Sequence, residues 1–445
     1  MKKYLLIPLF LMLVILFPTL VSAHTSLLEA NPAPNSELVK APETVTLTFS
    51  GTLDSSLYEI KLYQDEGKEV VFDEATKIED NQQTIYRELT DLDSGDYSLS
   101  YKVIGADGHV IEDTYSFSLR VDEQAALKEE DSEASEIVNE SVPEKENKDN
   151  KNEAISKEKE REEKLNNESE LDEATENHID VPAYLIRALY YFSLLTISGL
   201  VFWSFFTNIS KSSTEKVYRK SSMYLKVMLL ISVVISGYLQ SNSLLTDMTS
   251  ITTLLVETTI GRAWMSLIGL SILSFFILHR STFIDAIWIV LLLFTEAISG
   301  HANAMKPVIL NISLDIIHLG AAAIWISGIV ILLLFWKSNE VFIKSFIPIF
   351  STYALISMIT LAISGSVMTV FFLPDITLLW SSLWGQVLLL KIVVFIIIAL
   401  IGYFMRKAYK KTNQKAQQHL LKGDILLILV ILLVVSVLTH VSPLP

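Results

Sequence analysis

Residues 310–335 read LNISLDIIHLGAAAIWISGIVILLLF, a largely apolar run that includes two ionisable side chains, Asp315 and His318. About 20 apolar residues are enough for one helix to cross the hydrocarbon core of a bilayer. Seven more runs of comparable length lie between Val181 and the C-terminus, at residues 182–207, 223–241, 262–278, 283–300, 346–373, 384–405 and 424–441. The sequence therefore predicts an all-α polytopic membrane domain over residues 181–445, with eight transmembrane helices surrounded by the lipid bilayer.

The charges of the loops between these runs predict the orientation of the helices. If the first run passes from the outside to the inside, the inner loops hold most of the basic residues, namely Lys211, Lys216, Arg219, Lys220, Arg280, Lys337, Lys344, Arg406, Lys407, Lys410, Lys411, Lys415 and Lys422. The outer loops keep little besides Lys306 and Arg262. Cytoplasmic loops of membrane proteins carry an excess of lysine and arginine. We therefore expect a multi-pass protein of the cell membrane whose N-terminal domain and C-terminus are both extracytoplasmic.

Residues 1–23 have the three parts of a secretory signal peptide. Two lysines follow the first methionine, residues 4–20 are mostly apolar, and Val21-Ser22-Ala23 forms a cleavage site of small residues. An uncleaved signal anchor is the alternative interpretation. Cleavage after Ala23 would make His24 the first residue of the mature protein.

Residues 24–121 have the pattern of a soluble β-domain, because apolar and polar residues alternate along several stretches. Examples are TVTLTF at 44–49, YSLSYKV at 97–103 and YSFSL at 115–119, and turn residues separate such stretches. A period of two places every second side chain on the same face of a strand. No segment of this domain has a convincing helical period, so we expect a small antiparallel β-sandwich.

Residues 122–180 form a strongly acidic segment between the two domains. They contain 22 acidic and 8 basic residues, a net charge of −14 against −15 for the whole chain, and no aromatic residue. Such a composition buries too little apolar surface to offset the chain entropy, so we expect an acidic disordered linker that tethers the two domains. The acidity of the chain is therefore no sign of an acidic enzyme surface, and we expect no binding of nucleic acid.

Two segments of the β-domain carry residues suited to binding a metal, and the chain has no cysteine that could do so. An N-terminal His24 would offer its α-amine and its imidazole Nδ1 to one ion, because a metal readily displaces the proton of an α-amine near neutral pH. Asp107 and His109 add a carboxylate and a second imidazole beside one turn. Nitrogen-rich ligation with one oxygen suits Cu(II). Taken alone, His109 would more simply be a turn histidine without a metal.

The same segments resemble the CopC copper-binding family. The resemblance rests on HTSLL at 24–28, NPAPNS at 31–36, and DGH at 107–109 ahead of YSFSL at 115–119. It spans the whole β-domain and implies an immunoglobulin-like Greek-key sandwich, with a Cu(II) site built from His24, Asp107 and His109. Some members also carry a methionine-rich Cu(I) site. No methionine lies between His24 and Asp180, so we expect a domain that binds only Cu(II).

Several ionisable residues fall near the predicted outer ends of the transmembrane runs, where such side chains are costly and often functional. Asp315 and His318 are three residues apart and therefore share one face of a helix. We expect a site that admits copper, as Cu(I) or Cu(II), with the candidate ligands Glu296, His301, Met305, Asp315, His318 and His440. The alternative is that these histidines are interfacial. Met368 is interpreted as a packing residue, Lys391 as the partner of a carboxylate, and Trp384 as an interface or packing aromatic.

The membrane domain resembles the CopD family of membrane copper proteins, although the motifs are looser than those of the β-domain. They are SGHA at 299–302, Asp315 and His318 ahead of WISG at 325–328, and WGQ at 384–386 followed by Lys391. A CopC module ahead of a CopD module resembles the single-chain copper-uptake proteins of Gram-positive bacteria. The resemblance implies that copper is the cargo of the membrane domain.

These observations lead to the hypothesis that the protein acquires copper and transports it across the cell membrane, and that it is not an enzyme. The chain has no Walker loop, so we expect no use of ATP. A separate copper donor or reductase remains open as a further partner. Two other hypotheses stay open, a haem-containing membrane metal reductase and a copper-tolerance or sensing protein without uptake.

The role assigned to His24 can be tested by adding one alanine in front of it in a protein that comprises residues 24–121. The addition moves the free amine away from the imidazole and opens the chelate ring, so Cu(II) binding should weaken sharply. Titration of Cu(II) against a competing chelator measures the change. An affinity equal to that of the unextended domain would exclude the amine as a ligand.

Overall fold

The computed structural model describes residues 27–441, apart from residues 65–67, 71–74, 90–91, 106–109, 121–180, 208, 210–213, 245–250, 374 and 411–413. The predicted signal peptide, the predicted linker, His24, Asp107 and His109 lie outside the described residues. Within them the chain forms a β-sandwich and then a helical part, which confirms the predicted fold class.

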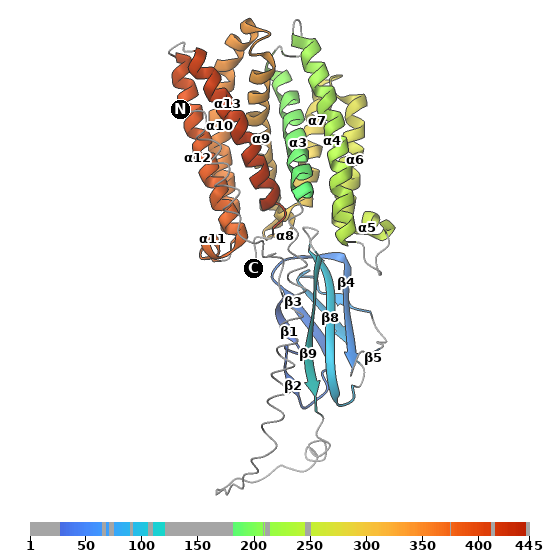
Figure 1. Ribbon diagram of the computed structural model, residues 1–445. Coiled ribbons are helices and arrows are strands. Elements are labelled where there is room, and N and C mark those ends of the chain that lie inside the picture. Colours follow the sequence, from blue (N-terminus) through green and yellow to red (C-terminus); the bar gives the residue numbers. More distant parts are fainter. Residues whose placement is uncertain are drawn as a thin grey trace, which may run out of the picture. The chain divides into compact units, whose positions relative to one another are not determined.

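The N-terminal part consists of two β-sheets (Figure 1). The four-stranded sheet has the order β1-β3-β7-β6, with β1 at Leu27–Asn31, β3 at Thr44–Phe49, β7 at Thr84–Glu88 and β6 at Lys77–Ile78. The five-stranded sheet has the order β2-β9-β8-β4-β5, with β2 at Glu37–Leu38, β9 at Val110–Leu119, β8 at Gly95–Gly105, β4 at Leu53–Gln64 and β5 at Lys68–Glu69. Successive strands pass repeatedly from one sheet to the other, as in Greek-key sandwiches.

The alternation in the sequence corresponds to the two faces of the strands. In β3 the residues at positions 45, 47 and 49 are buried, whereas the threonines between them are half-buried. The rings of Tyr97 in β8 and Phe117 in β9 stack with their centroids 5.4 Å apart inside the sandwich. The apolar faces of both sheets therefore form one core.

One strand pair departs from the predicted antiparallel arrangement. β2 pairs with β9 in parallel, with Glu37 opposite Ser118. The backbone N–H of Ser118 donates to the carbonyl oxygen of Ser36 at 2.9 Å, and that of Arg120 donates to Leu38 at 2.8 Å. This short segment thus provides hydrogen-bond partners for the edge of β9, which has no other neighbour on that side among the described strands.

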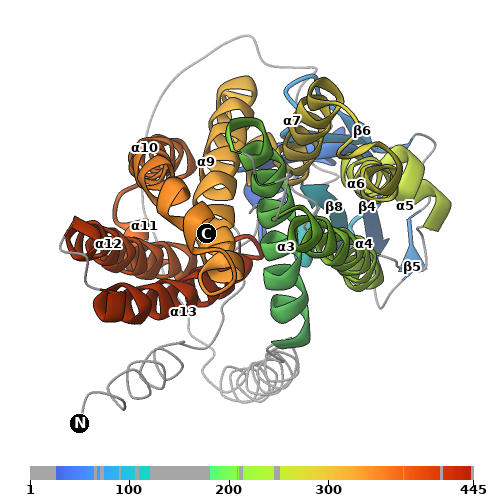
Figure 2. The ribbon, with the colours of Figure 1, turned by 90° about the horizontal axis from the view of Figure 1, so that it is seen from above.

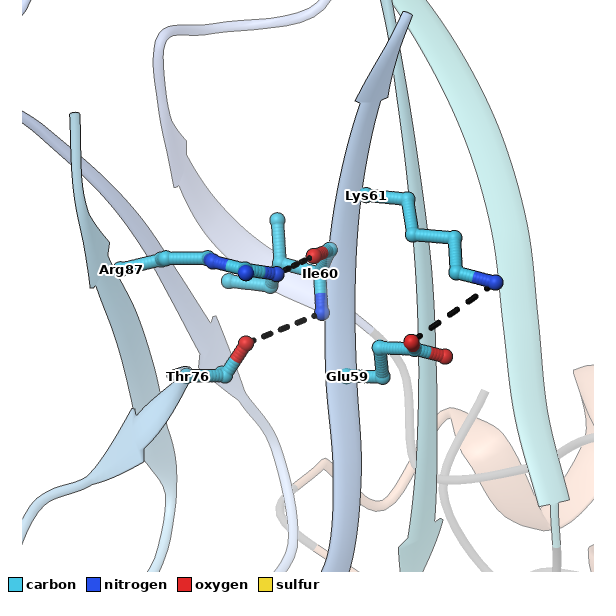
Figure 3. A network of polar contacts seen from close by, with 5 residues as sticks. All are labelled: Glu59, Ile60, Lys61, Thr76 and Arg87. Atoms are coloured by element: carbon cyan, nitrogen blue, oxygen red, sulfur yellow. Dashed lines mark hydrogen bonds and ion pairs between the residues drawn. The ribbon is translucent and has the colours of Figure 1, made fainter. Parts of the chain in front are cut away.

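The opposite edge of this sheet is satisfied by side chains (Figure 3). β5 pairs with β4 only at Tyr63 and Gln64, so no described strand pairs with that edge of β4 at Ile60. There the N–H of Ile60 donates to Thr76 Oγ1 at 3.2 Å, and its carbonyl oxygen accepts from Arg87 Nη1 at 2.5 Å. Because Arg87 belongs to β7, this bond also joins the two sheets. Unpaired backbone groups at a sheet edge would otherwise be open to other chains.

Eight helices among the described residues are long and apolar enough to cross a membrane. They are α3 Val181–Phe206, α4 Glu215–Leu244, α6 Thr259–Ile277, α7 Thr282–Ser299, α9 Val308–Phe335, α10 Glu340–Phe372, α12 Leu383–Lys410 and α13 Gln414–Leu438. The short helices α5 Ile251–Glu257, α8 His301–Ala304 and α11 Leu378–Ser381 lie at one end of the long ones (Figure 1). This agrees with the eight runs predicted from the sequence.

Some helices extend beyond the apolar runs that predicted them. α4 begins at Glu215 rather than near residue 223, and α12 continues to Lys410 rather than ending near 405. The additional turns carry basic residues and belong to ends that the loop charges assign to the cytoplasm. A hydropathy pattern detects the part of a helix that lies in lipid, whereas backbone hydrogen bonds continue the helix into water.

α3 and α9 lie between two groups of helices, with α10, α12 and α13 on one side and α4, α6 and α7 on the other (Figure 2). Gly199 of α3 makes their close approach possible. A Cβ atom at Gly199 would lie 2.0 Å from Ser327 Oγ and 2.1 Å from the carbonyl oxygen of Ala323 in α9. One turn further, Trp203 Nε1 donates to the carbonyl oxygen of Ile324 at 3.1 Å. Small residues at such contacts let membrane helices pack backbone against backbone.

Replacing Gly199 by alanine should therefore destabilise the helical part, because the new methyl group meets a backbone oxygen that cannot move out of the way. Overpacking of this kind typically costs about 1–3 kcal/mol. The matched control is Gly402→Ala in α12, where a Cβ atom would meet nothing within 4 Å. Thermal unfolding in detergent should show a lower midpoint for Gly199→Ala only. Equal midpoints for the two variants would contradict the close contact of α3 and α9.

Candidate functional site

A cavity of about 510 Å³ lies inside the helical part and is bordered by residues from all eight long helices. Its ionisable lining residues lie within about three turns of a helix end. These ends are the starts of α3, α9 and α12 and the end of α7, and they carry Arg187, Asp315, His318, Lys391 and Glu296. Because successive transmembrane helices alternate in direction, such ends lie on one side of the bundle. This is the side that the loop charges assign to the outside.

One wall of the cavity carries a hydrogen-bonded group around Glu296, which is only 7% exposed. Tyr190 of α3 donates a short hydrogen bond to Glu296 Oε2. The guanidinium of Arg187, one turn earlier in α3, donates to the carbonyl oxygen of Thr439 at 3.2 Å and to Gln240 Oε1 at 3.4 Å. Glu296 and Arg187 are thus stabilised by protein groups that replace water.

The parts of α9 and α12 that line the cavity carry Asp315, His318 and Lys391, which are all half-buried. Asp315 and Lys391 make no hydrogen bond or ion pair with another described residue, although the Asp315 carboxylate is attracted by Lys391 and repelled by Glu296. His318 Nδ1 lies 2.9 Å from Ser364 Oγ of α10. The carboxylate that attracts Lys391 is Asp315, although the two side chains form no direct ion pair.

The structure brings three of the six candidate membrane ligands, Glu296, Asp315 and His318, to the cavity. Met305 is buried beside α9, where its carbonyl oxygen accepts from Asn311 Nδ2 at 3.0 Å. His440 is exposed, with its Nδ1 3.3 Å from an Arg187 nitrogen. His301 begins α8, and its side chain lies outside the described residues.

Within the described ranges, no three His, Asp or Glu side chains are grouped closely enough to hold a metal ion. The membrane site predicted from the sequence remains a prediction. The described residues form a cavity large enough for a hydrated ion, and its possible ligand groups stand singly rather than in a cluster. A metal ion bound there would need ligands of another type, or water, to complete its coordination.

Some lining residues were missed or interpreted differently from the sequence. Arg187 stands inside the first apolar run, and a charged residue at such a position is a sufficient reason to expect function. Met368 of α10, interpreted as a packing residue, lines the cavity. So does Trp384, whose buried Nε1 has no hydrogen-bond partner among the described residues. No sequence signal marked either of these two residues as facing a cavity.

A second polar group surrounds His279, between the predicted inner ends of α6 and α7. Its Nδ1 lies 3.1 Å from the hydroxyl of Tyr218, and its Nε2 lies 2.8 Å from Ser222 Oγ. Burial, together with the positive charges of Lys226 and Arg219, lowers the pKa of His279 to about 4, so the ring is neutral near pH 7. Both ring nitrogens are engaged. His279 is therefore a structural residue, unlike His318, whose ring is hydrogen-bonded to the described residues through Nδ1 alone.

Comparisons with known proteins find similarity in both parts of the chain. The family model described as CopC domain matches residues 27–120, and the model described as Copper resistance protein D matches residues 344–442. The Copper transport protein CutJ of Bacillus subtilis (strain 168) is 22% identical over 472 residues, which cover 98% of this chain and 77% of CutJ. Protein YobA of Escherichia coli (strain K12) is 29% identical over 99 residues, which cover 22% of this chain and 80% of YobA.

Two solved structures are similar to the N-terminal part. The crystal structure of CopC from Methylosinus trichosporium OB3b has 27% sequence identity, covers 22% of this chain and 97% of that chain, and has a TM-score of 0.21. The crystal structure of PcoC, a methionine-rich copper resistance protein from Escherichia coli, has 22% identity, covers 22% of this chain and 100% of that chain, and has a TM-score of 0.20.

The cavity should be reachable by water from outside the cell, and the lack of native cysteines allows a clean test. Thr369 lines the cavity, whereas the neighbouring Val370 is 74% exposed on a surface away from it. Thr369→Cys should react quickly with a charged, membrane-impermeant thiol reagent added to cells, because the reactive thiolate forms in water. Val370→Cys, which would face lipid, should react slowly. Equal rates at the two positions would contradict an aqueous cavity.

Proposed function

Because the chain is a CopC–CopD fusion, and so a copper transport or resistance protein, we propose that it acquires copper outside the cell and moves it across the cell membrane. The extracytoplasmic β-domain captures Cu(II) and passes it to the cavity of the helical domain. In this proposal residues 24–121 capture the ion, residues 122–180 are the linker, and residues 181–445 form the membrane domain. The protein acts by binding and conduction of the ion, without chemistry on a further substrate.

The capture step is assigned to His24, Asp107 and His109. It is supported by the match of the CopC domain model to residues 27–120 and by the cleavage site that would expose His24. A nitrogen-rich site with one carboxylate suits Cu(II). A tether of the length of residues 122–180 would keep this donor at a high local concentration beside the membrane domain.

The membrane step is assigned to the cavity, and this cavity is the single observation on which the proposal most depends. A cation that leaves water for the hydrocarbon core loses its hydration, which is unfavourable unless other groups replace the water. Asp315 and Glu296 offer negative charge and His318 offers a nitrogen on the walls of one cavity within the membrane-spanning helices. These are the groups that a copper ion needs when it leaves the extracytoplasmic domain.

The proposal predicts that His318→Ala and His301→Ala stop copper uptake into cells while Cu(II) capture by the β-domain stays intact. The reason is that both changes remove ligands on the membrane side only. The matched control is His419→Ala, an exposed histidine in α13 outside the cavity. Cell-associated copper is measured against cells that lack the gene, with protein levels checked by blot.

The converse change, His109→Ala, should raise the external copper concentration needed for uptake without abolishing uptake when copper is plentiful. Capture is then weakened and the membrane route is unchanged. If both membrane variants accumulate copper as the unchanged protein does, these histidines are interfacial and the membrane step is assigned wrongly. If copper accumulation is the same with and without the gene, the protein confers tolerance or sensing rather than uptake.

A further inference from the structure

The hydrogen bonds of Ser364 determine which nitrogen of the His318 ring is held by the protein. Ser364 Oγ donates to the carbonyl oxygen of Thr360 at 2.7 Å, and a carbonyl can only accept. The single hydroxyl proton is used there, so at the contact with His318 Nδ1 the serine oxygen is the acceptor. Nδ1 therefore carries the ring proton. Nε2 keeps its lone pair and makes no hydrogen bond to another described residue.

The position of the ring is set by Gly365, the next residue of α10. A Cβ atom at Gly365 would lie 3.3 Å from His318 Cε1 and 3.8 Å from Nδ1. The Nδ1–Cε1 edge of the ring therefore rests against the backbone of α10, and Nε2, the next ring atom, lies beside this face. A histidine held through its protonated nitrogen by a hydrogen-bond acceptor is the usual arrangement of a metal-binding histidine.

Met368 lies on the same face of α10 as these two residues. It is four residues after Ser364 and three after Gly365, and side chains at such spacings are neighbours with Cβ atoms about 5–6 Å apart. Side chains of a helix lean toward its N-terminus, which directs the thioether of Met368 back toward Ser364 and the ring that Ser364 holds. Met368 therefore lies on the face of α10 that holds the His318 ring, and both residues line the cavity.

A neutral imidazole nitrogen and a thioether sulfur are a soft ligand pair that favours Cu(I) over Cu(II). We propose that the membrane cavity binds its cargo as Cu(I), between Nε2 of His318 and the sulfur of Met368, with Ser364 and Gly365 as positioning residues. A separate reductase outside this chain supplies the one electron that converts the captured Cu(II) to Cu(I) before the ion enters the cavity. This inference rests on the proposed function, because it names the form in which the cargo occupies the cavity. It also explains how a cavity without a cluster of carboxylates and histidines can hold a metal: the missing ligand is a methionine.

The test uses the purified full-length protein in detergent, without oxygen, loaded with one equivalent of Cu(I) in competition with a Cu(I)-specific chelator. Met368→Leu keeps the side-chain volume and removes the sulfur, so Cu(I) affinity should fall by at least about tenfold, the scale on which even outer-shell changes act. Met358→Leu is the matched control, on the same helix but away from the cavity lining. Its affinity should equal that of the unchanged protein.

X-ray absorption gives a readout that a structural role of Met368 would not change. Copper–sulfur scattering should be present in the unchanged protein and in Met358→Leu, and absent in Met368→Leu. The β-domain cannot supply this signal, because no methionine lies between His24 and Asp180. If copper–sulfur scattering persists in Met368→Leu or is missing from the unchanged protein, the inference is wrong.

A second variant keeps the test valid if Met368→Leu does not fold. Gly365→Ala should displace the ring by a few tenths of an ångström and weaken Cu(I) binding, whereas Gly402→Ala, with nothing within 4 Å of its new Cβ atom, should not. Unchanged affinity in Gly365→Ala would count against the inference. The uptake assay separates the two proposals: loss of uptake in His318→Ala together with unchanged Cu(I) binding in Met368→Leu retains the proposed function and overturns the inference.

Discussion

A charged side chain inside the hydrocarbon core of a bilayer is stable only where protein groups or water replace the solvent that it has lost. This constraint explains why the ionisable groups near the predicted outer ends of α3, α7, α9 and α12 gather around one cavity. Glu296 is held by Tyr190, and Arg187 is held by Thr439 and Gln240. The helix surfaces away from the cavity carry large exposed apolar side chains, as lipid contact requires. The polar side chains that could bind a cation therefore lie around the cavity, next to groups that are already hydrogen-bonded to each other.

The two histidines with described hydrogen bonds to serine illustrate how surroundings decide the role of one residue type. His279 is bonded at both ring nitrogens, to Tyr218 and Ser222, and is thereby closed to other ligands. Among the residues that the structure describes, His318 is bonded at Nδ1 alone, and the Nδ1–Cε1 edge of its ring rests against Gly365. The difference arises from the partners on neighbouring helices and is invisible in the apolar pattern of the sequence.

The division into a β-sandwich and eight membrane helices could be predicted from the sequence. The alternation of apolar and polar residues predicts the strands, and the length of the apolar runs predicts the helices. The alternation at positions 45, 47 and 49 and the run that carries Asp315 and His318 are local signals of this kind. The parallel pairing of β2 with β9 could not be predicted from the sequence. β2 has only two residues, and its partner strand follows about 80 residues later in the chain. In the same way, the sequence did not indicate that Met368 lines the cavity. Residues that pack between helices and residues that line a cavity are of the same apolar types. The assignment of copper to His24, Asp107 and His109 stays a prediction, because these residues lie outside the described ranges.

The contact between Gly199 and α9 limits how the helical part can move. Two helices whose backbones touch at a glycine cannot slide along each other, because a shift of a fraction of a turn would bring larger side chains into the same space. We therefore expect α3 and α9 to move together as one rigid pair, which includes His318. A carrier that opens first to one side of a membrane and then to the other would have to rotate this pair as a unit against the helices around it. Because α10 is one of these helices, such a rotation would change the contact between Ser364 and His318.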